Sequence, residues 1–139
     1  MLRQKIKKIF FSLTWLAALS IAVFCLAPTE SHALVITIDM APNVLNIQST
    51  GVVVTVHTDI GFGDVNASTV CLNGILISGW KADSRGNFVA KFSMEDVKAL
   101  PLTIDAYNTF TMEGETSSGE KFWGTQDILV INREPRSGI

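Results

Sequence analysis

Two aspartates that lie close together in the sequence are the first candidates for acid/base catalysis or cation binding. Asp59 and Asp64 flank the stretch Gly61-Phe62-Gly63, and two carboxylates in such a loop could act as an acid/base pair or hold a cation. A solvated loop is the simpler interpretation, because glycosidase-type chemistry needs two carboxylates that are fixed across a cleft. A small hydrolase that uses Asp59 and Asp64 is therefore a remote alternative.

A third aspartate lies in the run Asp83-Ser84-Arg85-Gly86-Asn87. Calcium prefers several oxygen ligands with net negative charge, and Arg85 would place a cation among them. The glycine and asparagine of this run favour a tight turn instead. We therefore expect no metal and no cofactor, with Asp59, Asp64 and Asp83 as weak metal candidates only.

The residues that could supply a nucleophile or a base are few. His57 is the only histidine after residue 33, and no Gly-x-Ser-x-Gly elbow accompanies it, so a hydrolase triad has no foundation. Cys71 is the only cysteine in the same part, which excludes a disulfide within it and nearly excludes a Cys/His zinc site. A buried thiol is the usual state of such a cysteine, and a disulfide-linked dimer through Cys71 is the alternative. We expect no catalytic residues and no enzyme.

Aromatic side chains are the remaining candidates for a binding site, namely Phe62, Trp80, Tyr107 and Trp123. Adjacent residues of a strand point to opposite faces, so one of Phe122 and Trp123 is expected to face outward. An exposed tryptophan with Trp80 or Tyr107 nearby would form a stacking platform for a sugar ring or an anchor in a protein interface. Alternatively, Trp80 is the core tryptophan of the domain and the others cover sheet edges.

A β-hairpin over residues 69–78 is the clearest element that could position these residues. Asn73-Gly74 separates two apolar runs by two residues, which is typical of a type I′ turn with positive φ at both positions. The resulting register pairs Leu72 with Ile75, Cys71 with Leu76, Val70 with Ile77 and Thr69 with Ser78. One face then carries four aliphatic side chains that need a core.

Further strands are predicted from β-branched or alternating segments at 34–40, 44–47, 52–57, 88–92, 110–113 and 122–131. In the third of these segments the valines Val52, Val54 and Val56 should face inward, and residues 59–66 should form a loop. Ser93 is expected to cap a short helix that ends before Pro101. About seven short strands, with one short helical crossover, predict an all-β, immunoglobulin-like sandwich of two sheets.

The first 33 residues have the pattern of an export signal. Four basic residues precede an uncharged apolar run from Ile9 to Ala27, and Ser31-His32-Ala33 fits cleavage after Ala33. The alternative is an uncleaved anchor that crosses the membrane as one helix. We therefore expect an exported protein, either periplasmic, extracellular or at the cell surface, with a signal peptide over 1–33.

The rest of the chain is long enough for one domain, which we place at 34–132 with a loose tail at 133–139. It holds seven basic and twelve acidic residues, a formal charge of −5. No basic cluster remains, so nucleic acid and anionic lipid surfaces are poor partners, and contact with a membrane is expected only if the first segment stays uncleaved.

A set of short motifs resembles a family of uncharacterised secreted β-sandwich modules from bacterial and archaeal surface proteins. The motifs are Ile38-Asp39-Met40-Ala41-Pro42-Asn43-Val44-Leu45-Asn46, Ser49-Thr50-Gly51, Val54-Thr55-Val56, Val65-Asn66-Ala67-Ser68-Thr69-Val70-Cys71-Leu72-Asn73-Gly74, Phe88-Val89-Ala90-Lys91-Phe92 and Glu113-Gly114-Glu115-Thr116 with Gly119. Members of that family often stand beside dockerin-like or other adhesive modules. Many carry an Asp-rich, calcium-type loop where this chain has only residues 83–87.

The resemblance implies a non-catalytic exported module that binds a protein or a surface polymer, or that serves as a structural spacer. A carbohydrate-binding module that uses Trp80, Tyr107 and Trp123 is the alternative. Partners of either kind would be a protein or a surface polysaccharide.

Overall fold

A computed structural model describes residues 32–136, and within this range ten strands form two sheets. The strands are β1 (Leu34–Val35), β2 (Ile38–Ala41), β3 (Val44–Asn46), β4 (Val53–Gly61), β5 (Val65–Leu72), β6 (Ile75–Leu76), β7 (Gly79–Ala82), β8 (Asn87–Ser93), β9 (Ala106–Thr116) and β10 (Lys121–Ile131). A 3₁₀ turn, η1 (Phe62–Asp64), and one short helix, α2 (Met94–Lys98), complete this part of the chain. Nearly all of the predicted signal segment lies outside the described residues. None of the described helices is long and apolar enough to span a membrane.

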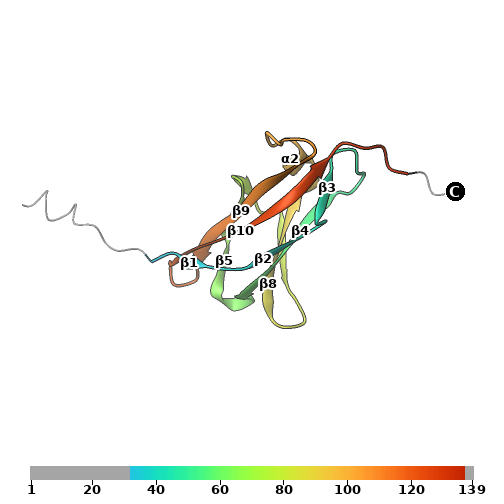
Figure 1. Cartoon of the computed structure of the whole chain (residues 1–139). Helices are drawn as coiled ribbons and strands as arrows, with labels where there is room; N and C mark the ends of the chain where they lie inside the picture. Colours follow the sequence, from blue (N-terminus) through green and yellow to red (C-terminus); the bar gives the residue numbers. More distant parts are fainter. Residues whose placement is uncertain (1–31, 137–139) are drawn as a thin grey trace, which may run out of the picture. The chain divides into compact units, whose positions relative to one another are not determined.

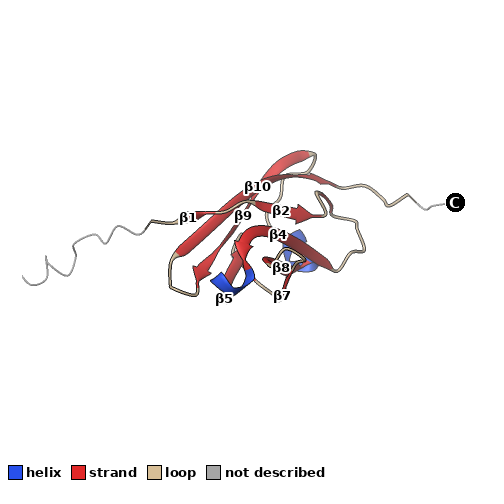
Figure 2. Cartoon of the chain, turned by 90° about the horizontal axis from the view of Figure 1, so that it is seen from below, coloured by secondary structure: helices blue, strands red, loops and turns tan. Residues whose placement is uncertain are grey.

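The two sheets pack face to face as a sandwich (Figures 1 and 2). The first sheet has the order β1-β10-β9-β5-β6, and β3 also pairs with β10; the second sheet has the order β2-β4-β8-β7. The pairings are antiparallel except that β1 and β3 run parallel to β10. The predicted all-β sandwich with one short helix is therefore confirmed at this level.

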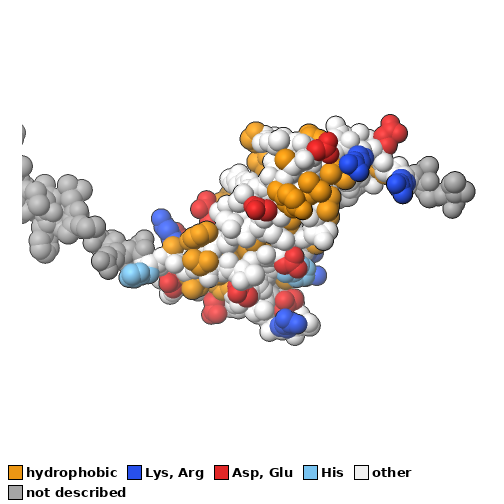
Figure 3. Space-filling view, viewed as in Figure 1, with side chains coloured by type: hydrophobic (Ala, Val, Ile, Leu, Met, Phe, Trp, Pro, Cys, Tyr) orange, Lys and Arg blue, Asp and Glu red, His pale blue; other side chains and the backbone are white. Residues whose placement is uncertain are grey.

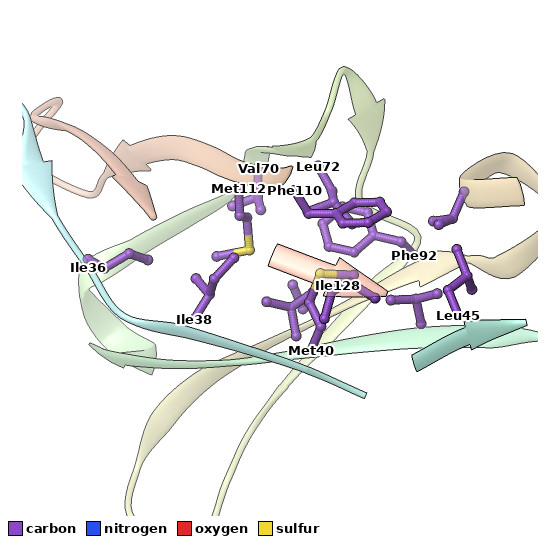
Figure 4. Close-up of a cluster of buried hydrophobic side chains, with 14 of the residues drawn as sticks. Ile36, Ile38, Met40, Leu45, Val70, Leu72, Phe92, Phe110, Met112 and Ile128 are labelled. Atoms are coloured by element: carbon purple, nitrogen blue, oxygen red, sulfur yellow. The ribbon is translucent and has the colours of Figure 1, made fainter. Parts of the chain in front are cut away.

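The core between the sheets follows the predicted alternation along the strands. Figure 4 shows side chains from both sheets in one cluster. The largest fully buried side chains include Phe88, Phe92, Phe110, Phe122, Leu45, Leu72, Met112 and Ile128. Val89, which alternates with Phe88 and Ala90 on β8, is buried as well but lies outside this cluster.

The predicted strand 34–40 is wrong as a single element, because the chain changes sheets within it. Val35 pairs with Trp123 of the first sheet, whereas Ile38 pairs with Thr58 of the second. Ile36 passes over Gly124 at the crossing, where a Cβ on Gly124 would lie 2.6 Å from the Ile36 carbonyl oxygen. Only glycine leaves room for this close approach of two backbones.

The predicted hairpin turn is confirmed. Asn73 and Gly74 have φ angles of 46° and 84°, and the neighbouring pairs are Leu72 with Ile75 and Cys71 with Leu76. The Asn73 side chain also ties the turn to β9, because its Oδ1 accepts from the N–H of Thr111 at 2.7 Å. The turn is thus fixed by local backbone preference and by one side chain.

The predicted pair Thr69 with Ser78 does not form. The N–H of Ile77 still donates to the Val70 carbonyl at 3.1 Å, but the N–H of Ser78 donates to Lys91 of the second sheet at 2.8 Å. The chain therefore leaves the first sheet after Ile77 and continues as β7. The second arm of the hairpin therefore begins in the first sheet as β6 and continues into the second sheet as β7.

The other differences concern the limits of elements. Val52 is exposed and precedes β4, so its predicted inward position is wrong, whereas Val54 and Val56 are buried. The predicted loop at 59–66 is also wrong, since β4 continues to Gly61 with Ile60 buried and only η1 interrupts the strands. The strand alternation extends through Ile60, and this pattern outweighs the glycines that suggested a loop.

The end of the sandwich where α2 and β3 lie is held by side-chain hydrogen bonds (Figure 1). The predicted cap is confirmed, because Ser93 Oγ accepts from the N–H of Asp96 at 3.5 Å at the start of α2. The last strand ends at Ile131, and Asn46 Oδ1 accepts from the N–H of Arg133 at 3.1 Å. The chain after β10 is thus tied to the end of β3 before it continues without regular structure.

Candidate functional site

The outer face of the first sheet carries large apolar side chains. Phe122 is buried, and its neighbour Trp123 faces outward and is 41% exposed, as the alternation predicted for this pair. Leu76 is 70% exposed and Tyr107 is 72% exposed on the same sheet. Figure 3 shows further hydrophobic side chains at the surface over β10 and β3, where Val44 lies opposite Leu129. Several of the exposed large apolar side chains in the described part of the chain therefore lie on this face.

The four predicted binding aromatics are all at least partly exposed, but they do not form one platform. Trp80 is 51% exposed on β7, an edge strand of the second sheet, so the core-tryptophan interpretation is wrong. Tyr107 and Trp123 share the outer face of the first sheet, yet the register places them six residues apart along β9, which is about 20 Å. The ring of Phe62 stacks on Phe88 with 6.2 Å between centroids and covers one end of the core.

A wide bulge in β5 hollows this outer face. Asn66 pairs with Glu115, but the next pair is Cys71 with Glu113, so four residues of β5 stand opposite the single residue Gly114. The Thr69 hydroxyl closes the gap: it accepts from the N–H of Glu115 at 2.8 Å and donates to the Asn66 carbonyl at 2.7 Å. The bulge is therefore a built feature rather than a frayed end.

A groove of about 360 Å³ lies over this bulge between β5, β9 and β10. Its walls include Thr69, Cys71, Glu113, Glu115, Lys121 and Trp123. The register forms a row across five strands, from Val35 through Trp123, Glu113 and Cys71 to Leu76. We take this groove, with the exposed side chains at its rim, as the candidate site.

Cys71 lies in the wall of the groove, and the prediction of a buried thiol is wrong. The residue is half-buried, because its side chain is on the outer face of the first sheet and only the bulge shelters it. Its Sγ lies 3.6 Å from the Thr69 carbonyl oxygen. The structure describes Cys71 as a free thiol, and the disulfide-linked dimer stays a prediction.

A second groove, of about 420 Å³, lies on the outer face of the second sheet and is lined by Asp39, His57, Asp59, Asp83 and Arg85 among others. Asp59 does not act with Asp64 there. Its Oδ1 accepts from the N–H of Thr37 at 2.9 Å, whereas Asp64 belongs to η1 and does not line the groove. Within residues 32–136 no three His, Cys, Asp or Glu side chains are placed so that they could hold a metal ion.

Asp83 organises the turn between β7 and β8. Its Oδ1 accepts from the N–H of Arg85 at 2.8 Å and of Asn87 at 2.9 Å, and Gly86 has a φ of 82°. The N–H of Asn87 is the main cause that lowers the pKa of Asp83 below its ordinary value of 3.8; the N–H of Arg85 and the charges of His57 and Arg85 add to this, and desolvation opposes it. The Asp83 carboxylate thus accepts hydrogen bonds within the turn, which agrees with the predicted tight turn.

The lowered pKa of Asp83 predicts a pH-dependent contribution to stability. Because the folded pKa is depressed, the ionised side chain stabilises the fold above about pH 3.8, and this contribution is lost as the pH falls through the lower folded value. We expect the variant Asp83→Asn to be less stable than the parent at pH 7 and the difference to shrink at about pH 2.5. Urea midpoints at the two pH values measure it, and a constant difference would contradict the prediction.

Glu113, Glu115 and Lys121 are among the residues of the candidate site that were not predicted from the sequence as site residues. Their outward positions can be read from the alternation along 106–116 and 121–131 once both strands are known. The bulge cannot be read in this way, since residues 67–70 contain no glycine or proline to mark it. Sequence patterns therefore indicate which side chains face outward but not where the surface is hollowed.

The comparisons with known proteins do not assign this chain to a family. No protein-family model, curated protein or solved structure matches it.

Proposed function

We propose that this protein is an exported, non-catalytic module of the immunoglobulin-like sandwich type that binds another protein through the outer face of its first sheet. The observation that carries the proposal is the open groove lined by Trp123, together with exposed Val35 and Leu76 in the same row of residues across the first sheet. Exposed tryptophans at the edge of a pocket are the usual anchors of protein interfaces. Export rests on the pattern of residues 1–33 alone.

The strand order supports the immunoglobulin-like classification. In that fold one sheet has the order ABED and the other contains C, F and G. If β2, β4, β8 and β7 are equated with A, B, E and D, then β5, β9 and β10 take the places of C, F and G. The parallel pairing of β1 and β3 with β10 fits a first strand that is shared between the sheets. Membership of the secreted-module family stays a prediction.

A protein ligand is favoured over a polysaccharide by the arrangement of the aromatic side chains. A sugar polymer stacks on aromatic rings, and Trp80 belongs to the other sheet from Tyr107 and Trp123. Between Tyr107 and Trp123 the face is polar, with Thr109 Oγ1 donating to Asp127 Oδ1 at 2.7 Å. Trp123 instead lines the groove and shares one row across the first sheet with the exposed side chains of Val35 and Leu76, and an aromatic anchor with apolar neighbours is typical of a protein interface.

The experiment is a pull-down of the purified chain from an envelope extract of its own host. We compare the parent with the double variant Leu76→Ala/Trp123→Ala, and with Val52→Ala as the control for an exposed apolar residue outside this face. Loss of anchor residues is expected to reduce retention of the partner about five- to thirtyfold. The control variant should retain it fully.

Two treatments identify the class of the partner. Prior digestion of the extract with protease should abolish retention, whereas periodate, which destroys sugars, should not. Retention that survives protease but not periodate would replace the protein partner by a polysaccharide. Equal retention by the parent and the double variant would overturn the proposed face.

A further inference from the structure

Negative charge exceeds positive charge among the residues that line the groove, which include two glutamates and one lysine. Glu113 lies directly opposite Trp123 across β9 and β10, and Glu115 lies directly opposite Lys121. All four residues line the groove. Lys121 is the only cation among the described residues that line the groove, and it lies opposite Glu115, so within this lining the Glu113 carboxylate next to Trp123 has no counter-charge.

This pairing of an aromatic ring with a carboxylate favours a cationic ligand group. The face of an indole attracts an ammonium or guanidinium ion, and a neighbouring carboxylate adds a charge-assisted hydrogen bond. An anionic group would be repelled by Glu113. A neutral group would gain contact with the ring but would leave the carboxylate without a partner.

The groove is large enough for one long side chain and is built before the ligand arrives. A volume of about 360 Å³ is at the low end of the range for small-molecule sites, which is roughly 300–1,000 Å³. Its floor is built by the β5 bulge, which the Thr69 hydroxyl locks to the backbone of β9. The groove is thus preformed, which lowers the entropic cost of binding.

We propose that the groove receives an arginine or lysine side chain of the partner protein, with the cation between the Trp123 ring and the Glu113 carboxylate. The inference rests on the proposed function in that it takes the outer face of the first sheet as the interface. It adds the chemistry of the central contact. Trp123 and Glu113 bind the cation, Cys71 and Thr69 line the groove beside it, and Lys121 competes with the ligand for the carboxylates.

The test uses blocked amino acids as probes and the indole N–H signal of Trp123 in the ¹⁵N-labelled chain as the readout. N-acetyl-arginine amide should move this signal with a Kd of roughly millimolar size, as expected for a ligand of so few atoms. The citrulline analogue has nearly the same shape without the charge and should bind about two- to fivefold more weakly. The indole signal of Trp80, on the other sheet, should not move.

Two variants with opposite expected effects separate binding from structural damage. Glu113→Gln should weaken arginine binding about two- to fivefold, whereas Lys121→Ala should strengthen it because a competing cation is removed. Glu95→Gln, on α2 outside the groove, is the control and should change nothing. A gain of affinity in Lys121→Ala cannot result from a loss of folded structure.

The inference is overturned if arginine and citrulline bind equally, if arginine leaves the Trp123 signal unmoved, or if Glu113→Gln and Lys121→Ala both leave affinity unchanged. Its failure is distinguishable from failure of the proposed function. If the pull-down still depends on Leu76 and Trp123 while arginine does not bind, the proposed protein-binding face is supported and the proposed contact with a cationic side chain is wrong. If arginine binds as described while retention in the pull-down does not depend on these residues, the cation site in the groove is supported and the proposed protein-binding face is wrong.

Discussion

Replacing Gly124 with valine is expected to prevent folding or to lower the free energy of unfolding by at least about 3 kcal/mol. A Cβ at this position would lie 2.6 Å from the Ile36 carbonyl oxygen and 3.0 Å from side-chain carbons of Ile36 and Ile38. The nearest obstacle is backbone, so no change of rotamer relieves it. The strain must be relieved by moving the strand that crosses between the sheets.

That strand has little freedom to move. The N–H of Ile36 donates to the Trp123 carbonyl at 2.9 Å on one side of the crossing, and the N–H of Met40 donates to Gln126 Oε1 at 2.7 Å on the other. Ile36, Ile38 and Met40 are all buried. A shift that admits a side chain at Gly124 therefore breaks hydrogen bonds and opens the core together.

Urea unfolding followed by circular dichroism measures the effect, and Gly63→Val is the matched control. Gly63 lies in η1, and no atom lies within 4 Å of the position that a Cβ would take there, so its substitution should change stability by less than about 1 kcal/mol. If Gly124→Val unfolds at the same urea concentration as the parent, the crossing of Ile36 over Gly124 is wrong.

The features that could be predicted from the sequence are those whose causes are local. Asn73 and Gly74 adopt positive φ because their own chemistry allows it, and Ser93 caps α2 because its hydroxyl reaches an N–H three residues later. Alternation within β8 likewise predicted that Phe88 and Phe92 are buried, and alternation within β10 predicted that one of Phe122 and Trp123 faces outward. In each case the residues that determine the feature lie within a few positions of one another.

The features that were missed depend on residues far apart in the chain. The strand 34–40 reads as one β-branched run, and only the passage of Ile36 over Gly124 reveals that it changes sheets. In the same way, Ser78 leaves β5 because Lys91 offers a carbonyl in the other sheet. Periodicity reports which face a side chain takes, but not which neighbouring strand the backbone meets.

The candidate site also combines a feature with a local cause and features that depend on residues far apart in the chain. The outward position of Trp123 followed from alternation, whereas its neighbours in the groove come from β5 and β9 through a register shift. The outward position of Cys71 depends on that shift, since regular alternation from the exposed Asn66 would turn Cys71 toward the core. The sequence thus allowed a prediction of which single side chains face outward, but not of the groove that they line.

Replacing Phe110 with alanine is expected to lower the free energy of unfolding by about 3–5 kcal/mol. Phe110 is fully buried in the middle of β9 and belongs to the cluster that joins both sheets (Figure 4). Truncation removes apolar contacts and leaves a cavity that a sandwich paired on both sides of β9 cannot collapse to fill. Since a domain of this size is stabilised by only about 5–15 kcal/mol, the variant should lie close to unfolding at ordinary temperature.

Phe62→Ala is the matched control for Phe110→Ala, because it deletes the same atoms from a ring that is partly exposed at one end of the core. Its cost should be less than half of the cost of Phe110→Ala, since solvent already reaches one side of the ring and little cavity is created. Phe110→Leu should recover most of the loss, because it restores much of the buried volume. Urea midpoints for the three variants decide the point: equal costs at positions 62 and 110 would mean that β9 does not pack its phenylalanine between the sheets.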